Sequence, residues 1–142
     1  MSVTLSDVQV GTELPAQRFD IQRVSMVRYA GASGDFNTIH WSESVAKRVG
    51  LPNVIAHGML TMAVAMRVVT DWLGDPGAVI DYGVRFTRPV VVPEDIGATL
   101  EVAGKIRSVD AENGTAVVDL IASVNGETVL AKARVTVRLA NA

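Results

Sequence analysis

Apolar positions follow two different periods along the chain, which divide it into a helical first half and a strand-rich second half. In the first half, alternation at residues 19–21 indicates a short strand. Ser25 is placed to cap a short helix over residues 26–32, because its hydroxyl can accept a free backbone N–H of the first turn. Ser42 is placed to cap a second short helix, which the Gly and Pro of residues 50–52 would end.

Residues 54–73, VIAHGMLTMAVAMRVVTDWL, are apolar on nearly every side of a helix. A helix of this kind is buried in a protein core or in a membrane. His57, Arg67 and Asp71 interrupt the run, so no clean stretch of about 18 apolar residues remains for a bilayer. The pattern therefore predicts a core helix covered by a sheet.

From residue 82 onward apolar residues alternate with polar ones, which is typical of strands with one buried face. The alternation covers residues 82–87, 100–107 and 129–139. In the last run the apolar set is Val129, Ala131, Ala133, Val135, Val137 and Leu139, and the polar set is Lys132, Arg134, Thr136 and Arg138. Asn113-Gly114 and Asn125-Gly126 predict hairpin turns, since both residue types tolerate a positive φ.

Together these elements predict an α+β fold in which a curled antiparallel sheet wraps around one long central helix. This is the hot-dog architecture, and it accounts for residues 1–142 as a single domain without internal repeats. An open sheet edge in so small a domain favours pairing with another hot-dog chain.

Composition narrows the possible functions. Thirteen basic and fifteen acidic residues give a net charge of -2, which excludes the basic face of a nonspecific nucleic-acid-binding protein. The absence of cysteine excludes disulfides, zinc–thiolate sites and thiol nucleophiles. The first residues, MSVTLSDVQVGTELP, contain no basic region leading into an apolar run. We therefore expect a cytoplasmic protein without membrane insertion, and the sequence indicates no cofactor.

The stretch YAGASGDFNTIHW, residues 29–41, places an acid and a base close together. Gly34 precedes Asp35 and permits a tight turn and close substrate approach, and Asn37 is suited to holding the shape of the loop. In one interpretation Asp35 and Asn37 satisfy backbone donors while His40 caps a helix. In the other, Asp35 and His40 form an acid–base pair. With two histidines in the chain and no clustered carboxylates, no metal site is expected.

His57 and Gly58 lie where the buried helix begins, the region in which free N–H groups and the positive end of the helix dipole gather. Two interpretations are open here. His57 is a capping residue and Gly58 permits close packing, or the Gly58 N–H forms an oxyanion hole.

The motif resembles the signature of the MaoC-like dehydratases, the (R)-specific enoyl-thioester hydratases. The matching positions are Tyr29, Gly34, Asp35, Asn37, Ile39, His40 and Ala46. IAHGMLTM is similar to the head of the central helix in this family, and the resemblance extends over essentially the whole chain, most closely to the catalytic subunits of mycobacterial (3R)-hydroxyacyl-carrier-protein dehydratases. Two positions depart from the family pattern: Thr38 replaces the usual proline, and Met66 replaces a serine that supports the site in homodimeric bacterial hydratases.

The resemblance implies reversible dehydration of (3R)-hydroxyacyl thioesters to trans-2-enoyl thioesters, in fatty-acid elongation. It implies His40 as the base at the α-carbon, Asp35 as the group that handles the hydroxyl, and the Gly58 N–H as the donor to the thioester oxygen. An acyl tunnel would be lined by Met59, Met62 and Met66, which equally suit ordinary core packing. Cations suited to the phosphates of a carrier are Lys47, Arg48, Arg85 and Arg88.

The implied substrate is an acyl-carrier protein or acyl-CoA thioester, and the implied partner is a second copy or a paralogous non-catalytic subunit. One alternative is a homodimeric (R)-specific enoyl-CoA hydratase in β-oxidation or polyhydroxyalkanoate supply. An alternative of another class is a non-catalytic hot-dog partner, which has no reason to keep both Asp35 and His40. A thioesterase on this fold would use a differently placed carboxylate.

Overall fold

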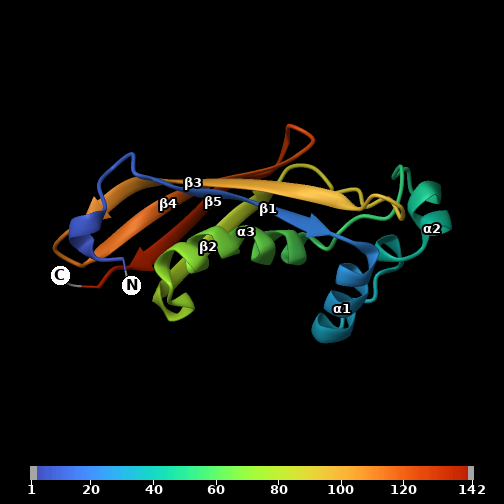
Figure 1. Ribbon diagram of the computed structural model, residues 1–142. Helices are drawn as coiled ribbons and strands as arrows, with labels where there is room; N and C mark the ends of the chain where they lie inside the picture. The colour runs from blue at the N-terminus through green and yellow to red at the C-terminus, as the bar shows by residue number, and fades with distance from the viewer. Residues whose placement is uncertain (1–2, 141–142) are drawn as a thin grey trace.

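A five-stranded antiparallel sheet curls around one long helix in the computed structural model, which describes residues 3–140 (Figure 1). The strand order is β1-β3-β4-β5-β2. The strands are β1 (Glu13–Ile21), β2 (Val79–Phe86), β3 (Ala98–Asp110), β4 (Thr115–Val124) and β5 (Glu127–Arg138), and the long helix is α3 (Gly58–Leu73). The predicted α+β hot-dog architecture is confirmed.

Two shorter helices, α1 (Arg23–Ser33) and α2 (Glu43–Arg48), both lie beyond the N-terminal end of α3 (Figure 1). Three single 3₁₀ turns complete the fold: η1 (Leu5–Asp7), η2 (Thr38–His40) and η3 (Pro76–Ala78). The segment from α1 to α2, residues 23–48, therefore lies at one end of the sheet, where α3 begins. We call this segment the α1–α2 overhang.

The helix α3 begins four residues later than the apolar run predicts. Residues 54–56 are extended instead, with Ala56 N–H donating to the Val90 carbonyl at 2.8 Å and Val92 N–H donating to the Val54 carbonyl at 2.9 Å. The helix is also not buried on every side. The sheet covers the face formed by Thr61, Ala65, Val68, Val69 and Leu73, whereas Met59 on the other side is 57% exposed.

The strand β1 is longer than the predicted residues 19–21, since it begins at Glu13. A register shift between Leu14 and Gln17 breaks the alternation, so the buried Leu14 falls out of phase with Phe19. In β2, Tyr82 and Val84 are half-buried as expected, but Phe86 is 51% exposed.

A β-bulge in β5 interrupts its predicted alternation. Lys132 has a φ of 47°, and the residues paired with Leu120 and Ala122 are Ala133 and Leu130, so two residues of β5 face one residue of β4. Ala131, predicted on the apolar face, is consequently only half-buried, and its neighbour Leu130 is buried. Beyond the bulge the prediction holds through Leu139.

The two Asn-Gly pairs lie in the predicted hairpins. Asn125 and Gly126 both have positive φ, 51° and 78°, which is the conformation of a tight two-residue turn. The other hairpin is a longer turn over residues 111–114, in which only Gly114 has a positive φ, 63°. Its Asp110 carboxylate accepts the N–H of Asn113 at 3.1 Å.

Both short helices exist, with one correction at α1. This helix begins at Arg23, and Ser25 lies inside its first turn, where its hydroxyl accepts the Gln22 N–H at 3.2 Å instead of capping a later start. Ser42 caps α2 as predicted, accepting the Val45 N–H at 3.4 Å.

Within residues 3–140, no helix is both long enough and apolar enough to cross a membrane. The cytoplasmic location and the single-domain assignment stay predictions.

Candidate active site

The loop between α1 and η2 holds its shape through its own side chains. Gly34 ends α1 with a φ of 76°, and its N–H donates to the Ala30 carbonyl at 2.9 Å. The Asp35 carboxylate then accepts the Asn37 N–H at 3.1 Å, and the Asn37 side chain accepts the Ile39 N–H at 3.3 Å. These contacts start η2 at the position that carries His40 toward Asp35.

Arg23 joins the α1–α2 overhang to other parts of the chain through hydrogen bonds. Its guanidinium donates to the Val92 carbonyl at 2.6 Å, to Glu43 at 2.8 Å and to Asn53 at 2.9 Å. These partners lie on three different segments, so the start of α1 is held against α2 and against the segments that contain Asn53 and Val92.

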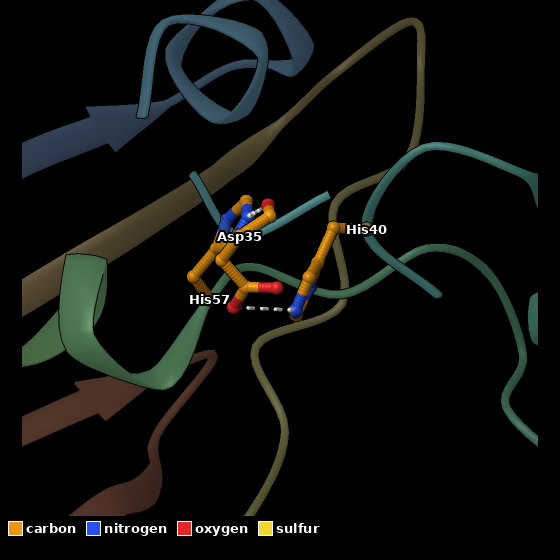
Figure 2. A group of neighbouring side chains, drawn as sticks. All are labelled: Asp35, His40 and His57. Atoms are coloured by element: carbon orange, nitrogen blue, oxygen red, sulfur yellow. Dashed lines mark hydrogen bonds and ion pairs between the residues drawn. The ribbon is translucent and has the colours of Figure 1, made fainter. Parts of the chain in front are cut away.

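Asp35 and His40 lie side by side, as Figure 2 shows. The His40 Nε2 is 3.9 Å from an Asp35 carboxylate oxygen, too far for a direct hydrogen bond and suited to a water or hydroxyl shared between them. The His40 Nδ1–H donates to the Ile55 carbonyl at 2.7 Å. This contact leaves the lone pair of the neutral ring on Nε2, the atom that faces Asp35.

The two groups differ in their access to water. The His40 side chain is 9% exposed and the Asp35 side chain 51%. Burial is the main cause that lowers the pKa of His40 below its usual 6.5; the Ile55 carbonyl opposes this shift, His57 adds to it, and Asp35 opposes it. His40 is therefore an uncharged base at neutral pH.

His57 is the residue that the sequence did not assign to this site. It is 2% exposed, and its ring stacks on that of His40 with centroids 3.8 Å apart. Its Nε2–H donates to the backbone carbonyl of Asp35 at 3.0 Å. His57 does occupy the N-cap position of α3, but within residues 3–140 its side chain makes no capping hydrogen bond. Nothing in the sequence signals a ring stack between residues seventeen positions apart.

Gly58 is the first residue of α3, and its N–H donates to no acceptor within residues 3–140. A Cβ at this position would lie 3.1 Å from the Phe86 ring, which is closer than ordinary packing, so glycine lets this ring lie close to the start of α3. The two interpretations of Gly58 are compatible. Close packing against Phe86 depends on the missing Cβ, whereas an oxyanion hole would use the backbone N–H.

Two cavities adjoin His40. One, of about 290 Å³, is lined by Ile55, Gly58, Phe86, Arg88 and Leu130 among others. The other, of about 210 Å³, is lined by Met26, Val27, Ala30, Phe36, Trp41 and His57 together with His40. Met59, Met62 and Met66 line neither cavity, and their role in an acyl tunnel stays a prediction.

Asp35, His40 and His57 also form a cluster in which one ligand atom from each lies within 4.8 Å of the others. The sequence did not predict this cluster. Its geometry is poor for a metal ion, because the ring planes of the two histidines are only 23° from parallel and their in-plane lone pairs do not converge. The His57 Nε2 is moreover engaged by the Asp35 carbonyl. The arrangement suits proton transfer.

A family model described as "MaoC like domain" matches residues 7–124. The chain belongs to the MaoC-like family. It is 39% identical over 83 residues to "3-hydroxyacyl-thioester dehydratase X" of Mycobacterium tuberculosis, which covers 58% of this chain and 29% of that protein. It is 35% identical over 99 residues to "3-hydroxybutyryl-CoA dehydratase" of Methylorubrum extorquens, which covers 68% of this chain and 62% of that protein.

A solved structure described as "MaoC-like dehydratase" superposes with a TM-score of 0.95 at 43% identity, covering 98% of this chain and 43% of the other. One chain of the ChsH1-ChsH2 complex from Mycobacterium tuberculosis shares the fold, with a TM-score of 0.80 at 21% identity over 93% of this chain and 98% of that chain. This MaoC-like chain thus spans less than two thirds of the length of the two dehydratase relatives and of the MaoC-like dehydratase of known structure.

Proposed function

We propose that this chain catalyses the reversible dehydration of (3R)-hydroxyacyl thioesters to trans-2-enoyl thioesters, as part of fatty-acid elongation. The observation that carries the proposal is the pairing of the Asp35 carboxylate with the free Nε2 of His40, 3.9 Å apart beside the head of α3. Membership of the MaoC-like family and the names of the dehydratase relatives support the same reaction.

The reaction needs a base for the α-proton, an acid for the departing hydroxyl and a donor for the thioester oxygen. His40 Nε2 removes the proton from the α-carbon, the electrons of that C–H bond form the C=C bond, and the C–O bond at the β-carbon breaks. Asp35 holds the departing hydroxyl and passes it a proton, so that it leaves as water, and the proton taken up by His40 returns to Asp35. General acid–base steps of this kind contribute about 10²- to 10⁴-fold each.

The thioester oxygen gains negative charge as the α-proton leaves. The Gly58 N–H is its proposed donor, because it has no acceptor among the described residues, lies on a cavity shared with His40 and stands at the positive end of α3. Arg88 lines the same cavity, although it also pairs with Glu127, and is the proposed contact for a phosphate of CoA or of a carrier protein.

We further propose that residues 1–142 act as one hot-dog domain paired with a second hot-dog chain, a copy or a paralogue. The strand β2 is an open edge of the sheet, and Ile80 and Phe86 on it are 49% and 51% exposed. Sedimentation of the purified chain, alone and after co-expression with a candidate paralogue, distinguishes a homodimer from a mixed pair.

The decisive experiment is hydration of crotonyl-CoA, followed as loss of enoyl absorbance. Asp35→Asn should keep the fold and lose most of the turnover, because the amide cannot handle the proton. Asp95→Asn is the matched control, since Asp95 is exposed and makes no side-chain hydrogen bond within the described residues. Wild-type turnover in Asp35→Asn would contradict the assignment, and turnover that appears only with a paralogue would assign the chain to a mixed pair.

A further inference from the structure

His57 is a buried polar side chain whose contacts all lead to the candidate active site. Its ring contacts His40 by stacking, at 3.8 Å between centroids, and lies 4.8 Å from the ring of Tyr29. Its Nε2–H donates to the Asp35 carbonyl at 3.0 Å, as the dashed line in Figure 2 marks. The next residue along the chain is Gly58, the proposed oxyanion donor.

The Nδ1 atom of His57 lowers the stability of the folded protein. The His57 Nδ1 is buried and has no hydrogen-bond partner among the described residues. Buried polar atoms are almost always paired, and an unpaired one lowers stability relative to an apolar side chain of the same shape. A residue present only to fill the core would not bring this cost, so His57 has a further role.

The geometry also fixes where the ring hydrogens lie. A carbonyl only accepts, so His57 carries its hydrogen on Nε2, and the orphaned Nδ1 is the lone-pair atom. His40 has the opposite arrangement, with its hydrogen on Nδ1 toward Ile55. The two stacked rings are therefore opposite tautomers, each held by a backbone carbonyl.

We propose that His57 is a positioning residue that holds the Asp35 loop, the His40 ring and the Gly58 N–H in one fixed arrangement. The inference rests on the function proposed above. The hydrogen bond to the Asp35 carbonyl ties the loop to the start of α3, the stack limits tilting of the His40 ring, and the peptide link to Gly58 places the oxyanion donor. Such placement matters, because a 1 Å displacement of reacting groups can cost about 10²-fold in rate.

The first test measures the tautomers of the two histidines in the wild-type protein and does not depend on activity. The chain has two histidines, so ¹⁵N chemical shifts of the imidazole nitrogens at neutral pH are simple to assign. We expect the hydrogen on Nε2 in His57 and on Nδ1 in His40. A His57 hydrogen on Nδ1, or fast averaging between the two tautomers, would overturn the proposal.

The second test separates the hydrogen bond from the stack by substitution. His57→Phe keeps an aromatic ring and loses the donor, whereas His57→Gln keeps an N–H donor near the position of Nε2. We expect kcat to fall about 10²-fold in His57→Phe with KM changed only a few-fold, and to be partly restored in His57→Gln. Wild-type kcat in His57→Phe would refute the positioning role.

Tyr82→Phe is the matched control for a purely structural effect. Its hydroxyl donates to the Met62 carbonyl of α3 at 2.9 Å, away from Asp35 and His40, so the variant loosens α3 without touching the acid–base pair. A kcat loss as large in Tyr82→Phe as in His57→Phe would reduce His57 to a stabilising residue.

Amide hydrogen exchange tests the positioning role of His57 independently of the proposed reaction. The N–H groups of Asn37 and Ile39 are held by the loop's own side chains at 3.1 and 3.3 Å. Their exchange should rise in His57→Phe and stay unchanged in Tyr82→Phe. If the wild type lacked hydratase activity both alone and with a paralogue, while exchange rose in this way, the proposed reaction would be wrong and the positioning role would stand. Unchanged exchange would remove the positioning role whatever the activity.

Discussion

His40 donates its Nδ1–H to the carbonyl of Ile55 at 2.7 Å, and the Ile55 N–H in turn donates to the Ile39 carbonyl at 3.2 Å. These two contacts join the loop of η2 to the extended segment before α3. They orient the base, because a ring held through Nδ1 must present its Nε2 lone pair to Asp35.

The first prediction concerns pH. Burial lowers the pKa of His40 below 6.5, so the ring is in its basic form at pH 7 and loses activity only in more acidic solution. The kcat/KM profile for crotonyl-CoA hydration should be level near neutrality and fall with a midpoint below 6.5. A midpoint above 6.5 would contradict the environment described for this ring.

The same shift affects stability with a defined sign. The unfolded chain binds the His40 proton at a higher pH than the folded chain does, since the folded-state pKa is the lower one. The contribution of His40 is therefore fully present above about pH 6.5 and is lost as the pH falls through the folded-state pKa. Denaturant unfolding of wild type and His40→Gln across this range should show the acid loss only in the wild type.

His40→Gln also tests the base itself. The Gln side chain is polar and of similar length but has no basic nitrogen, so the fold should persist while kcat falls about 10²- to 10⁴-fold. Circular dichroism checks the fold and the crotonyl-CoA assay checks the rate. Turnover within a few-fold of wild type would assign the proton transfer to another group.

Thr38→Pro should stabilise the protein and leave catalysis unchanged. Thr38 is the first residue of η2, its N–H donates to no acceptor within residues 3–140, and Asn37 before it has φ -54° and ψ 128°, which a following proline accepts. Restricting the unfolded chain at such a position is worth about 0.4–1 kcal/mol. Thermal unfolding measures the gain, and a lower Tm would show that the backbone of η2 does not fit proline.

Gly31 inside α1 and Gly34 at its C-terminal cap provide a paired test of backbone conformation. A Cβ on Gly31 or on Gly34 meets no atom within 4 Å, but only Gly34 has a left-handed φ, 76°. Gly34→Ala should lower the free energy of unfolding by about 1–2 kcal/mol, whereas Gly31→Ala inside the helix should raise it by about 0.5–1 kcal/mol. Equal effects in chemical denaturation would show that the turn at Gly34 rearranges.

Periodicity in the sequence determined the architecture of this protein. Alternation along β3 and most of β5, and the apolar run of α3, reflect burial on one side of each element, which a single sequence records directly. Predictions from local sequence failed where pairing with another strand changes the alternation or the conformation of a segment. The bulge at Lys132 and the register shift after Leu14 depend on the neighbouring strand, and residues 54–56 were drawn out of the helical pattern by pairing with residues 90–92.

The candidate site also has parts that the sequence predicted and parts that it did not. Asp35, Asn37 and His40 lie in one loop, so their spacing and their resemblance to a family motif were readable from the sequence, and so was the glycine at the start of α3. The role of His57 was not, because its contacts with Asp35 and His40 join segments separated by the whole of α2. Only the packing of the α1–α2 overhang against the head of α3, fastened by Arg23, brings these groups together.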